Sequence, residues 1–332
     1  MWLKGAVFGL VAASLTIGPV QAGGLADPQG LQTALQALAR EHPGRVGICA
    51  QDERGPPVCV NGDQRFSLQS VMKLVVGAAL MSAIDEGRFS LDDPITVRRE
   101  DMSVFVQPIE KIVAARGSFA TTLGDLMRRA VVESDSAATD ILIGRLGGPA
   151  AVQRFLERRG IVGIRVDRTE RQLQTEAYGL TWVDGYLFPE RHLAAIKAVP
   201  KAQRDAAFAA YLKDERDTAT PRGMAAFLQA LAAGRLLSPA STRHFIEVMR
   251  QTVTFPDRLR AGAPAGWSVG HKTGTGVTWN GIASVTNDVG ILTAPDGGTI
   301  AVAAFVAEST APAKDRAAVI AGASRAVTGA YR

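Results

Sequence analysis

A serine and a lysine occupy the start of an apolar segment, FSLQSVMKLVVGAALMSAIDEG at residues 66–87. Lys73 is the only charged residue from Val71 to Ile84, and the segment contains no proline. We therefore predict a helix buried inside the fold. Ser70 precedes Lys73 by about one helical turn, so both side chains share one face. The unpaired N–H groups and positive dipole of a helix start would stabilise an oxyanion formed by attack of Ser70.

This pair alone also has an ordinary structural explanation. Ser70 could cap the helix, while Lys73 could lay its aliphatic stem along apolar neighbours and keep its ammonium group in water. A lysine that stays buried needs polar partners instead. The chemical interpretation of the pair therefore depends on other segments of the chain.

Three further segments carry polar residues that could serve this pair. Ser134-Asp135-Ser136 lies between two predicted helices, where a short turn would direct its hydroxyls into a cleft. Lys272-Thr273-Gly274-Thr275 lies in a strand-like segment, and Gly274 leaves room for a ligand along the strand. Arg168-Thr169-Glu170, followed by Gln174, contains one candidate general base. Taken singly, the three segments are also typical of a turn, an edge strand and a solvated loop.

In this order, the motifs resemble those of the class A serine β-lactamases. The resemblance rests on Ser70-Val71-Met72-Lys73, Ser134-Asp135-Ser136, Glu170 with Gln174, and Lys272-Thr273-Gly274, and it extends over most of the chain. The spellings LQSVMK, HKTGTG and TNDVGI look most like the PER-like branch, which is associated with extended-spectrum cephalosporin hydrolysis. The resemblance implies hydrolysis of penicillins and cephalosporins, with no metal and no cofactor.

The resemblance also implies roles in acylation. Ser70 would attack the lactam carbonyl, and the N–H groups of Ser70 and Thr275 would form the oxyanion hole. Lys272 would act as a second cation near Lys73 and favour a neutral amine there that is suited to proton transfer. Ser134 would pass a proton to the departing ring nitrogen.

Substrate binding and deacylation are assigned in the same way. Lys272, with Thr273 or Thr275, would hold the substrate carboxylate. Arg258 lies where some family members place an arginine that steers this carboxylate, although it could equally be a surface charge. Glu170 would activate the water that releases the product.

The sequence departs from the family pattern at three positions of the cleft. Ser136 stands where an asparagine usually contacts the substrate amide, and a hydroxyl cannot offer both a carbonyl and an NH₂ group. Gln174 stands where an asparagine often helps to hold the deacylating water. An aromatic residue that often flanks the cleft is replaced by Val106, with Phe105 beside it.

The largest departure is in the Ω-loop region, residues 165–217. Asp214 is expected to pair with Arg168, but far more residues separate Glu170 from Asp214 than ordinary loops contain. FPERHLAAIKAV and PKAQRDAAFAAYLKD predict two helices, each beginning near a proline. We expect an inserted helical hairpin that Tyr178, Trp182 and Tyr186 pack down. It would cover the cleft or lie at its edge, and affect substrate choice more than the basic chemistry.

The strand-like segments lie near both ends of the chain with helical segments between them, and this order predicts the fold. An amphipathic helix at residues 29–41 and a hairpin precede a long helical region, and three strand-like segments and a final helix follow it. We predict a three-layer α/β sandwich with an antiparallel sheet plus an inserted all-α domain. Residues 23–66 and 256–332 would form the sandwich, and residues 67–255 the all-α domain.

The two cysteines, Cys49 and Cys59, flank the predicted hairpin turn and could face each other across it. In an oxidising compartment a disulfide would form there, with two buried thiols that never meet as the alternative. The beginning of the chain is typical of a secretory signal: Lys4 precedes an apolar core and a small-x-small cleavage site ending at Ala22. A membrane anchor is the alternative, but Gly18 and Pro19 interrupt the apolar part.

The remaining composition limits the possible partners. The net charge is +5, but the basic residues are scattered rather than gathered in a stripe, so no nucleic acid is expected. The four histidines lie far apart and fit no metal spacing. We expect an exported enzyme, periplasmic or secreted, that works as a monomer on β-lactam antibiotics without stable membrane association.

Two alternative functions share part of the motif set. A penicillin-binding DD-peptidase or transpeptidase shares Ser-x-x-Lys and Lys-Thr-Gly, but it would lack a deacylating glutamate and often carries an anchor. A non-hydrolytic β-lactam sensor would be acylated and stop there. Glu170 and the missing anchor favour the hydrolase over the peptidase, and the sensor remains an alternative.

Overall fold

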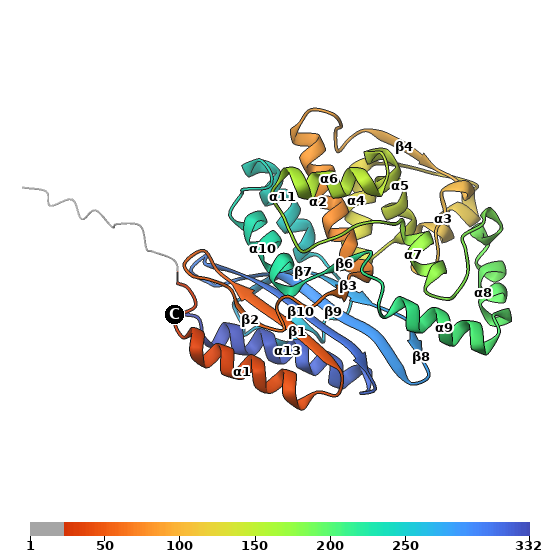
Figure 1. Cartoon of the computed structure of the whole chain (residues 1–332). Helices are drawn as coiled ribbons and strands as arrows, with labels where there is room; N and C mark the ends of the chain where they lie inside the picture. Colours follow the sequence, from red (N-terminus) through yellow and green to blue (C-terminus); the bar gives the residue numbers. More distant parts are fainter. Residues whose placement is uncertain (1–22) are drawn as a thin grey trace, which may run out of the picture.

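The computed structural model describes residues 23–332 (Figure 1). A twisted sheet with two helices on one face occupies one part of the molecule, and most of the remaining helices gather beside it. The predicted three-layer α/β sandwich with an antiparallel sheet and an all-helical region is confirmed.

The main sheet joins strands from both ends of the chain. Its order is β2-β1-β10-β9-β7, all neighbours are antiparallel, and the short β8 pairs with β9. The strands are β1 (Arg45–Gln51), β2 (Val58–Val60), β7 (Ser268–Thr275), β8 (Thr278–Trp279), β9 (Ile282–Thr293) and β10 (Thr299–Ser309). Strands β9 and β10 are buried along nearly their whole length, because helices cover both faces of the sheet.

Helices form the outer layers and the all-helical region. They are α1 (Pro28–Glu41), α2 (Met72–Asp85), α3 (Ile109–Arg116), α4 (Leu123–Arg128), α5 (Ser136–Leu146), α6 (Pro149–Arg158), α7 (Glu170–Glu176), α8 (Pro189–Ala198), α9 (Lys201–Tyr211), α10 (Pro221–Ala232), α11 (Pro239–Arg250), α12 (Leu259–Gly262) and α13 (Ala313–Gly329). Helices α1 and α13 share an apolar core with one face of the sheet, and α10 packs on the other face.

Helix α2 runs through the centre of the helical region. Its residues from Met72 to Ala83 are all buried, which confirms the prediction of an internal helix. The helix begins with the short 3₁₀ turn η1 (Gln69–Val71), so Ser70 lies in the turn and Lys73 in the first turn of α2. The nucleophile candidate is therefore attached to one of the most deeply buried elements of the molecule.

The region predicted to be helical also contains short strands. Strand β4 (Pro94–Val97) pairs with β5 (Phe119–Thr122), and β3 (Phe66–Ser67) pairs with β6 (Thr218–Ala219). The β-branched and aromatic residues of β4 and β5 favour extended backbone, which explains this small antiparallel pair within the helical region. Three short helical turns also lie in this region: η2 (Arg99–Asp101), the π-helical η3 (Arg129–Glu133) and η4 (Asp184–Leu187).

Cys49 and Cys59 lie directly opposite each other in the β1–β2 ladder and form a disulfide. Among residues 23–332, no helix is both long enough and apolar enough to cross a membrane. The signal peptide predicted for residues 1–22 lies outside the described residues.

Candidate active site

Ser70 lies at a turn whose backbone is held in an unusual conformation. Gln69, just before it, has a φ of 47°, a left-handed value that non-glycine residues seldom adopt. Ser70 itself is partly exposed and lines a pocket of about 150 Å³. Gly274 of strand β7 packs against this turn, because an added Cβ would lie 2.7 Å from the carbonyl oxygen of Leu68. The edge strand and the nucleophile turn thus meet backbone to backbone.

The buried lysine has the polar partners that its position requires. Lys73 is fully buried, and its Nζ donates to the carbonyl oxygen of Ser134 at 2.6 Å and to Oγ of Ser136 at 3.0 Å. The same Nζ lies 3.6 Å from a carboxylate oxygen of Glu170. The structure therefore excludes the alternative in which Lys73 extends into water.

Ser134 connects the two buried lysines. It follows η3 with a left-handed φ of 63°, and its Oγ lies 3.4 Å from Nζ of Lys73 and 3.0 Å from Nζ of Lys272. Asp135 holds this turn in place, because its carboxylate accepts hydrogen bonds from the N–H groups of Ile109 and Ala138. A hydroxyl between two ammonium groups is well placed to relay a proton.

Lys272 is carried by the edge strand β7 and points into the same cluster. It is fully buried, and it also donates to the carbonyl oxygen of Thr273 at 3.0 Å. Burial, followed by the positive charge of Lys73, lowers the pKa of Lys272 to about 7. Thr273 shares a hydrogen bond of 2.6 Å with Thr254. Lys272 is therefore a cation that gains strongly from an anionic ligand.

Arg258 is not a surface charge, since it is only 3% exposed. Its guanidinium donates to the carbonyl oxygens of Gly274 and Asn287 and to Oγ1 of Thr275, at 3.0, 2.8 and 2.7 Å. Burial lowers its pKa to about 10. Arg258 therefore places a positive charge behind the end of β7 and orients the Thr275 hydroxyl.

Glu170 opens helix α7, where Thr169 caps the helix. Its carboxylate is 99% buried, and its Oε2 accepts from Nε2 of Gln174 at 3.2 Å, one helical turn later. Its Oε1 has no hydrogen-bond partner among the described residues. A buried carboxylate with one free oxygen beside an amide is the arrangement expected for a base that binds a water molecule.

Asp140 of helix α5, which belongs to none of the predicted motifs, holds this base in position. Its carboxylate accepts from the backbone N–H groups of Glu170 and Arg171, at 2.6 and 3.1 Å, and from the hydroxyl of Ser103 at 2.8 Å. A charged residue in the apolar segment SAATDILIGRL was the signal that could have indicated it.

Five of the eleven predicted catalytic and substrate-binding residues line the pocket, and the others lie behind its wall or at its end. Its lining includes Ser70, Phe105, Ser136, Glu170, Gln174 and Thr275. Phe105 is 44% exposed and has a φ of 57°, so this aromatic residue does flank the cleft. Val106 lines the same pocket, so the valine and its aromatic neighbour both flank the cleft, in keeping with their predicted positions.

The predicted pair between Arg168 and Asp214 is present, but it is not the main anchor of the Ω region. The main partner of Arg168 is the buried Asp217, at 2.6 Å, and Asp214 is a second and more exposed partner at 3.2 Å. Glu176 also pairs with Arg168, at 2.7 Å. Asp217 could be overlooked because Asp214 lies so near it in the same acidic segment.

The predicted helical hairpin is present as α8 and α9, and α9 bridges the Ω region and strand β8. The guanidinium of Arg204 stacks on the rings of Tyr178 and Trp279, at 3.7 and 4.9 Å from their centroids. Asp205 accepts from the indole N–H of Trp279 at 2.7 Å. The aromatic ring of Tyr178 therefore packs the insertion down, as the sequence predicts.

Comparison with known proteins agrees with this geometry. Residues 30–331 match the model of the β-lactamase enzyme family, and the chain belongs to that family. Relatives include β-lactamase VEB-1 of Pseudomonas aeruginosa, 28% identical over 86% of this chain and 84% of the relative. The carbapenem-hydrolyzing β-lactamase KPC of Klebsiella oxytoca is 28% identical over 87% and 84% of the two chains.

Solved structures give the class. A reconstructed last common ancestor of the class A β-lactamases of Gram-negative bacteria aligns with a TM-score of 0.72 and 34% identity, covering 91% of this chain and 99% of that chain. A β-lactamase from Chitinophaga pinensis aligns with a TM-score of 0.73 and 27% identity, covering 90% and 98%. The protein is accordingly a class A β-lactamase.

Proposed function

We propose that the enzyme hydrolyses penicillins and cephalosporins through an acyl-enzyme on Ser70, with Glu170 as the base for deacylation. The observation that carries this proposal is the position of the Glu170 carboxylate. It is buried, one of its oxygens is bonded to Gln174, and the other lies 3.6 Å from Nζ of Lys73.

Acylation uses the chain of hydroxyl and ammonium groups around Ser134. Ser70 attacks the lactam carbonyl, and Lys73 lies one turn away to take part in the proton transfer. The Ser134 hydroxyl, within 3.4 Å of Lys73 and 3.0 Å of Lys272, passes a proton to the departing ring nitrogen. The N–H groups of Ser70 and Thr275 stabilise the oxyanion.

The substrate carboxylate binds at the end of β7. Lys272 supplies the charge, and the hydroxyls of Thr273 and Thr275 supply hydrogen bonds. Gly274 keeps this strand open to the ligand, and Arg258 acts through its bond to the Thr275 hydroxyl. Ser136 lines the pocket but donates no amide, so its contact with the substrate is weaker than that of an asparagine.

Deacylation distinguishes this function from its alternatives. A penicillin-binding DD-peptidase or a β-lactam sensor would be acylated at Ser70 and keep the acyl group for a long time. A carboxylate with a free oxygen beside Ser70 and an amide at Gln174 favours a bound water and rapid release of the product.

The test is the variant Glu170→Ala with a penicillin substrate. We expect a burst of one equivalent, after which deacylation is slowed about 10²–10⁴-fold, because the general base acts on that step. Intact mass should then reveal the acyl-enzyme. Glu190→Ala, in the exposed first turn of α8, is the matched control and should turn over normally. Wild-type turnover in Glu170→Ala would exclude the assignment of the base.

Several broader proposals accompany the mechanism. Export to the periplasm or medium is supported by the Cys49–Cys59 disulfide, which persists in oxidising compartments. We also propose a monomer with the sandwich at residues 23–66 and 256–332 and the helical domain at residues 67–255. The motifs LQSVMK and HKTGTG support a place near the PER-like branch within the class.

A further inference from the structure

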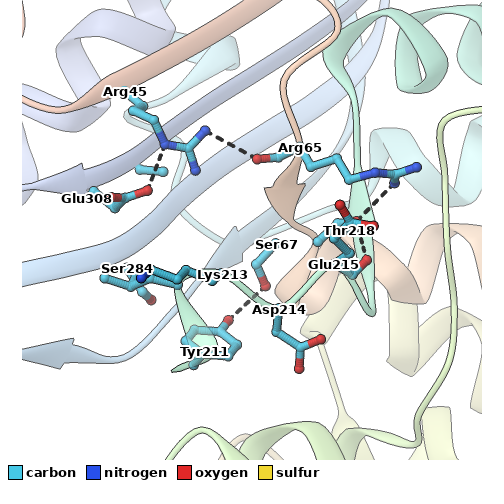
Figure 2. A pocket seen from close by; sticks show the side chains of 12 residues that line it. Arg45, Arg65, Ser67, Tyr211, Lys213, Asp214, Glu215, Thr218, Ser284 and Glu308 are labelled. Atoms are coloured by element: carbon cyan, nitrogen blue, oxygen red, sulfur yellow. Dashed lines mark hydrogen bonds and ion pairs between the residues drawn. The ribbon is translucent and has the colours of Figure 1, made fainter. Parts of the chain in front are cut away.

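Tyr211 brings the insertion into contact with the active-site turn. It is the last residue of α9, is only 7% exposed, and packs its ring in an apolar cluster with Leu173 of α7 and Ala177 just after that helix. Its hydroxyl lies 2.7 Å from Oγ of Ser67, at the wall of a second cavity of about 180 Å³ (Figure 2). Helix α7 carries Glu170, so Tyr211 packs directly beneath the element that holds the base.

A continuous line of hydrogen bonds leads from this hydroxyl to the base. Nε2 of Gln69 donates to the Tyr211 hydroxyl, and Oε1 of Gln69 accepts from Nε2 of Gln174 at 2.7 Å. The same nitrogen of Gln174 donates to Oε2 of Glu170 at 3.2 Å. The Tyr211 hydroxyl thus accepts from Gln69 and shares a second hydrogen bond with Ser67, in which either oxygen can donate.

The direction of these bonds determines which atom of Gln174 remains free. Both of its bonds inside the network use the amide nitrogen, so its carbonyl oxygen is turned away from Gln69 and Glu170. Within residues 23–332 this oxygen accepts no hydrogen bond. It is therefore available, together with the free Oε1 of Glu170, to bind the hydrolytic water.

We propose that Tyr211 is a positioning residue for deacylation. Its hydroxyl fixes the amide of Gln69, Gln69 fixes the amide of Gln174, and Gln174 then presents its carbonyl oxygen to the water that Glu170 deprotonates. Tyr211 touches neither substrate nor water. The inference rests on the proposed function, because it takes Glu170 as the base.

Two further features keep Tyr211 in this role. Burial raises the pKa of the Tyr211 phenol, so at neutral pH the hydroxyl stays protonated and keeps its hydrogen bond with Ser67. The other side of α9 is fixed to β8, since Asp205 accepts hydrogen bonds from Trp279 and Asn280 at 2.7 and 3.0 Å. On this proposal the insertion contributes to the basic chemistry, whereas the sequence predicts that it affects substrate choice more.

The test is Tyr211→Phe, which removes the hydroxyl and keeps the ring. Acylation and deacylation rates with one penicillin are measured separately by stopped flow and quenched-flow mass spectrometry. We expect deacylation to slow by about tenfold or more, because Gln69 loses a buried partner and the Gln174 amide can rotate, while acylation changes little. Tyr186→Phe is the matched control, because the Tyr186 hydroxyl bonds to no other described residue. Its deacylation should equal that of the wild type.

A double-mutant cycle tests the route. In a Gln174→Ala background, Tyr211→Phe should have almost no further effect on deacylation, because the residue through which Tyr211 acts is gone. Equal effects in both backgrounds would contradict the proposed route from Tyr211 through Gln69 to Gln174. Equal losses in acylation and deacylation would contradict it as well. A melting temperature close to that of the wild type confirms that the fold is intact. If Glu170→Ala stalls as an acyl-enzyme while Tyr211→Phe turns over normally, the proposed function stands and this inference fails.

Discussion

Nε of Arg168 lies 2.6 Å from Oδ2 of Asp217, across 49 residues of sequence, and both side chains are almost completely buried. The other carboxylate oxygen of Asp217 accepts from the backbone N–H groups of Asp167 and Arg168, at 2.7 and 3.0 Å. One carboxylate therefore joins the two ends of the segment that carries both Glu170 and the inserted helices.

Removing that carboxylate should destabilise the protein strongly. We expect Asp217→Ala to lower the free energy of unfolding by about 3–5 kcal/mol, because it leaves the Arg168 charge buried without its main partner. Asp214→Ala removes the more exposed partner and should cost no more than about 1 kcal/mol. Urea denaturation of both variants measures the difference. Equal losses would show that Asp214 shares the anchoring role, as the sequence first predicts.

The pH profile should report the titration of Lys272. The pKa of Lys272 is lowered to about 7 by burial and by Lys73, so the ammonium form predominates below that pH and is lost above it. We expect kcat/KM to be level below about pH 7 and to fall as the pH rises further, since the substrate carboxylate needs the charged form. A bound carboxylate stabilises the ammonium group, so kcat should fall only at higher pH.

Lys272→Arg is the control for this profile. An arginine stays protonated throughout the accessible range, so the alkaline decrease in kcat/KM should disappear even if the maximum is lower. A decrease that remains unchanged in Lys272→Arg would assign it to another group.

Arg258 should affect substrate binding through Thr275. In Arg258→Ala the Thr275 hydroxyl loses its donor and two carbonyl oxygens lose theirs, so we expect KM to rise about tenfold and stability to fall by about 1–3 kcal/mol. Arg243→Ala, at an exposed position of α11, should change neither quantity. An unchanged KM in a destabilised Arg258→Ala would limit the role of Arg258 to holding the strand.

The disulfide can be tested by counting thiols. Denatured protein treated with an alkylating agent should gain no mass without reductant and two alkyl groups with it, since Cys49 and Cys59 are bonded. Replacing both cysteines by alanine should cost about 2–3 kcal/mol, because the small closed loop no longer restricts the unfolded chain. Alkylation without reductant would contradict the bond.

Local patterns were enough to predict much of this molecule. The strands at both ends of the chain follow from their apolar content and their turns, and a lysine buried in α2 indicates a polar cluster wherever its partners lie. The four motifs that surround this cluster could be recognised because each keeps its spacing along the chain. That these four motifs come together in space was inferred from the family resemblance, not from the residues alone.

Relationships between distant segments were not predictable in the same way. Asp140 bonds to backbone N–H groups, which leave no trace in the sequence of their donors. Gln69 looks like any polar residue at a helix start, and only the fold brings Tyr211 from the insertion to its amide. The left-handed backbone of Phe105, with a φ of 57°, has no signature in the sequence either.

The pairing of β1 with β10 has a consequence for the newly made chain. Strand β1 ends at Gln51, but its partner β10 begins only at Thr299. Until the last part of the chain has been made, β1 can therefore pair only with β2. Contacts between such distant segments form slowly because a long loop must close first. During that interval the disulfide lies within the only part of the main sheet that can already exist, and can hold an early hairpin in register until the last strands arrive.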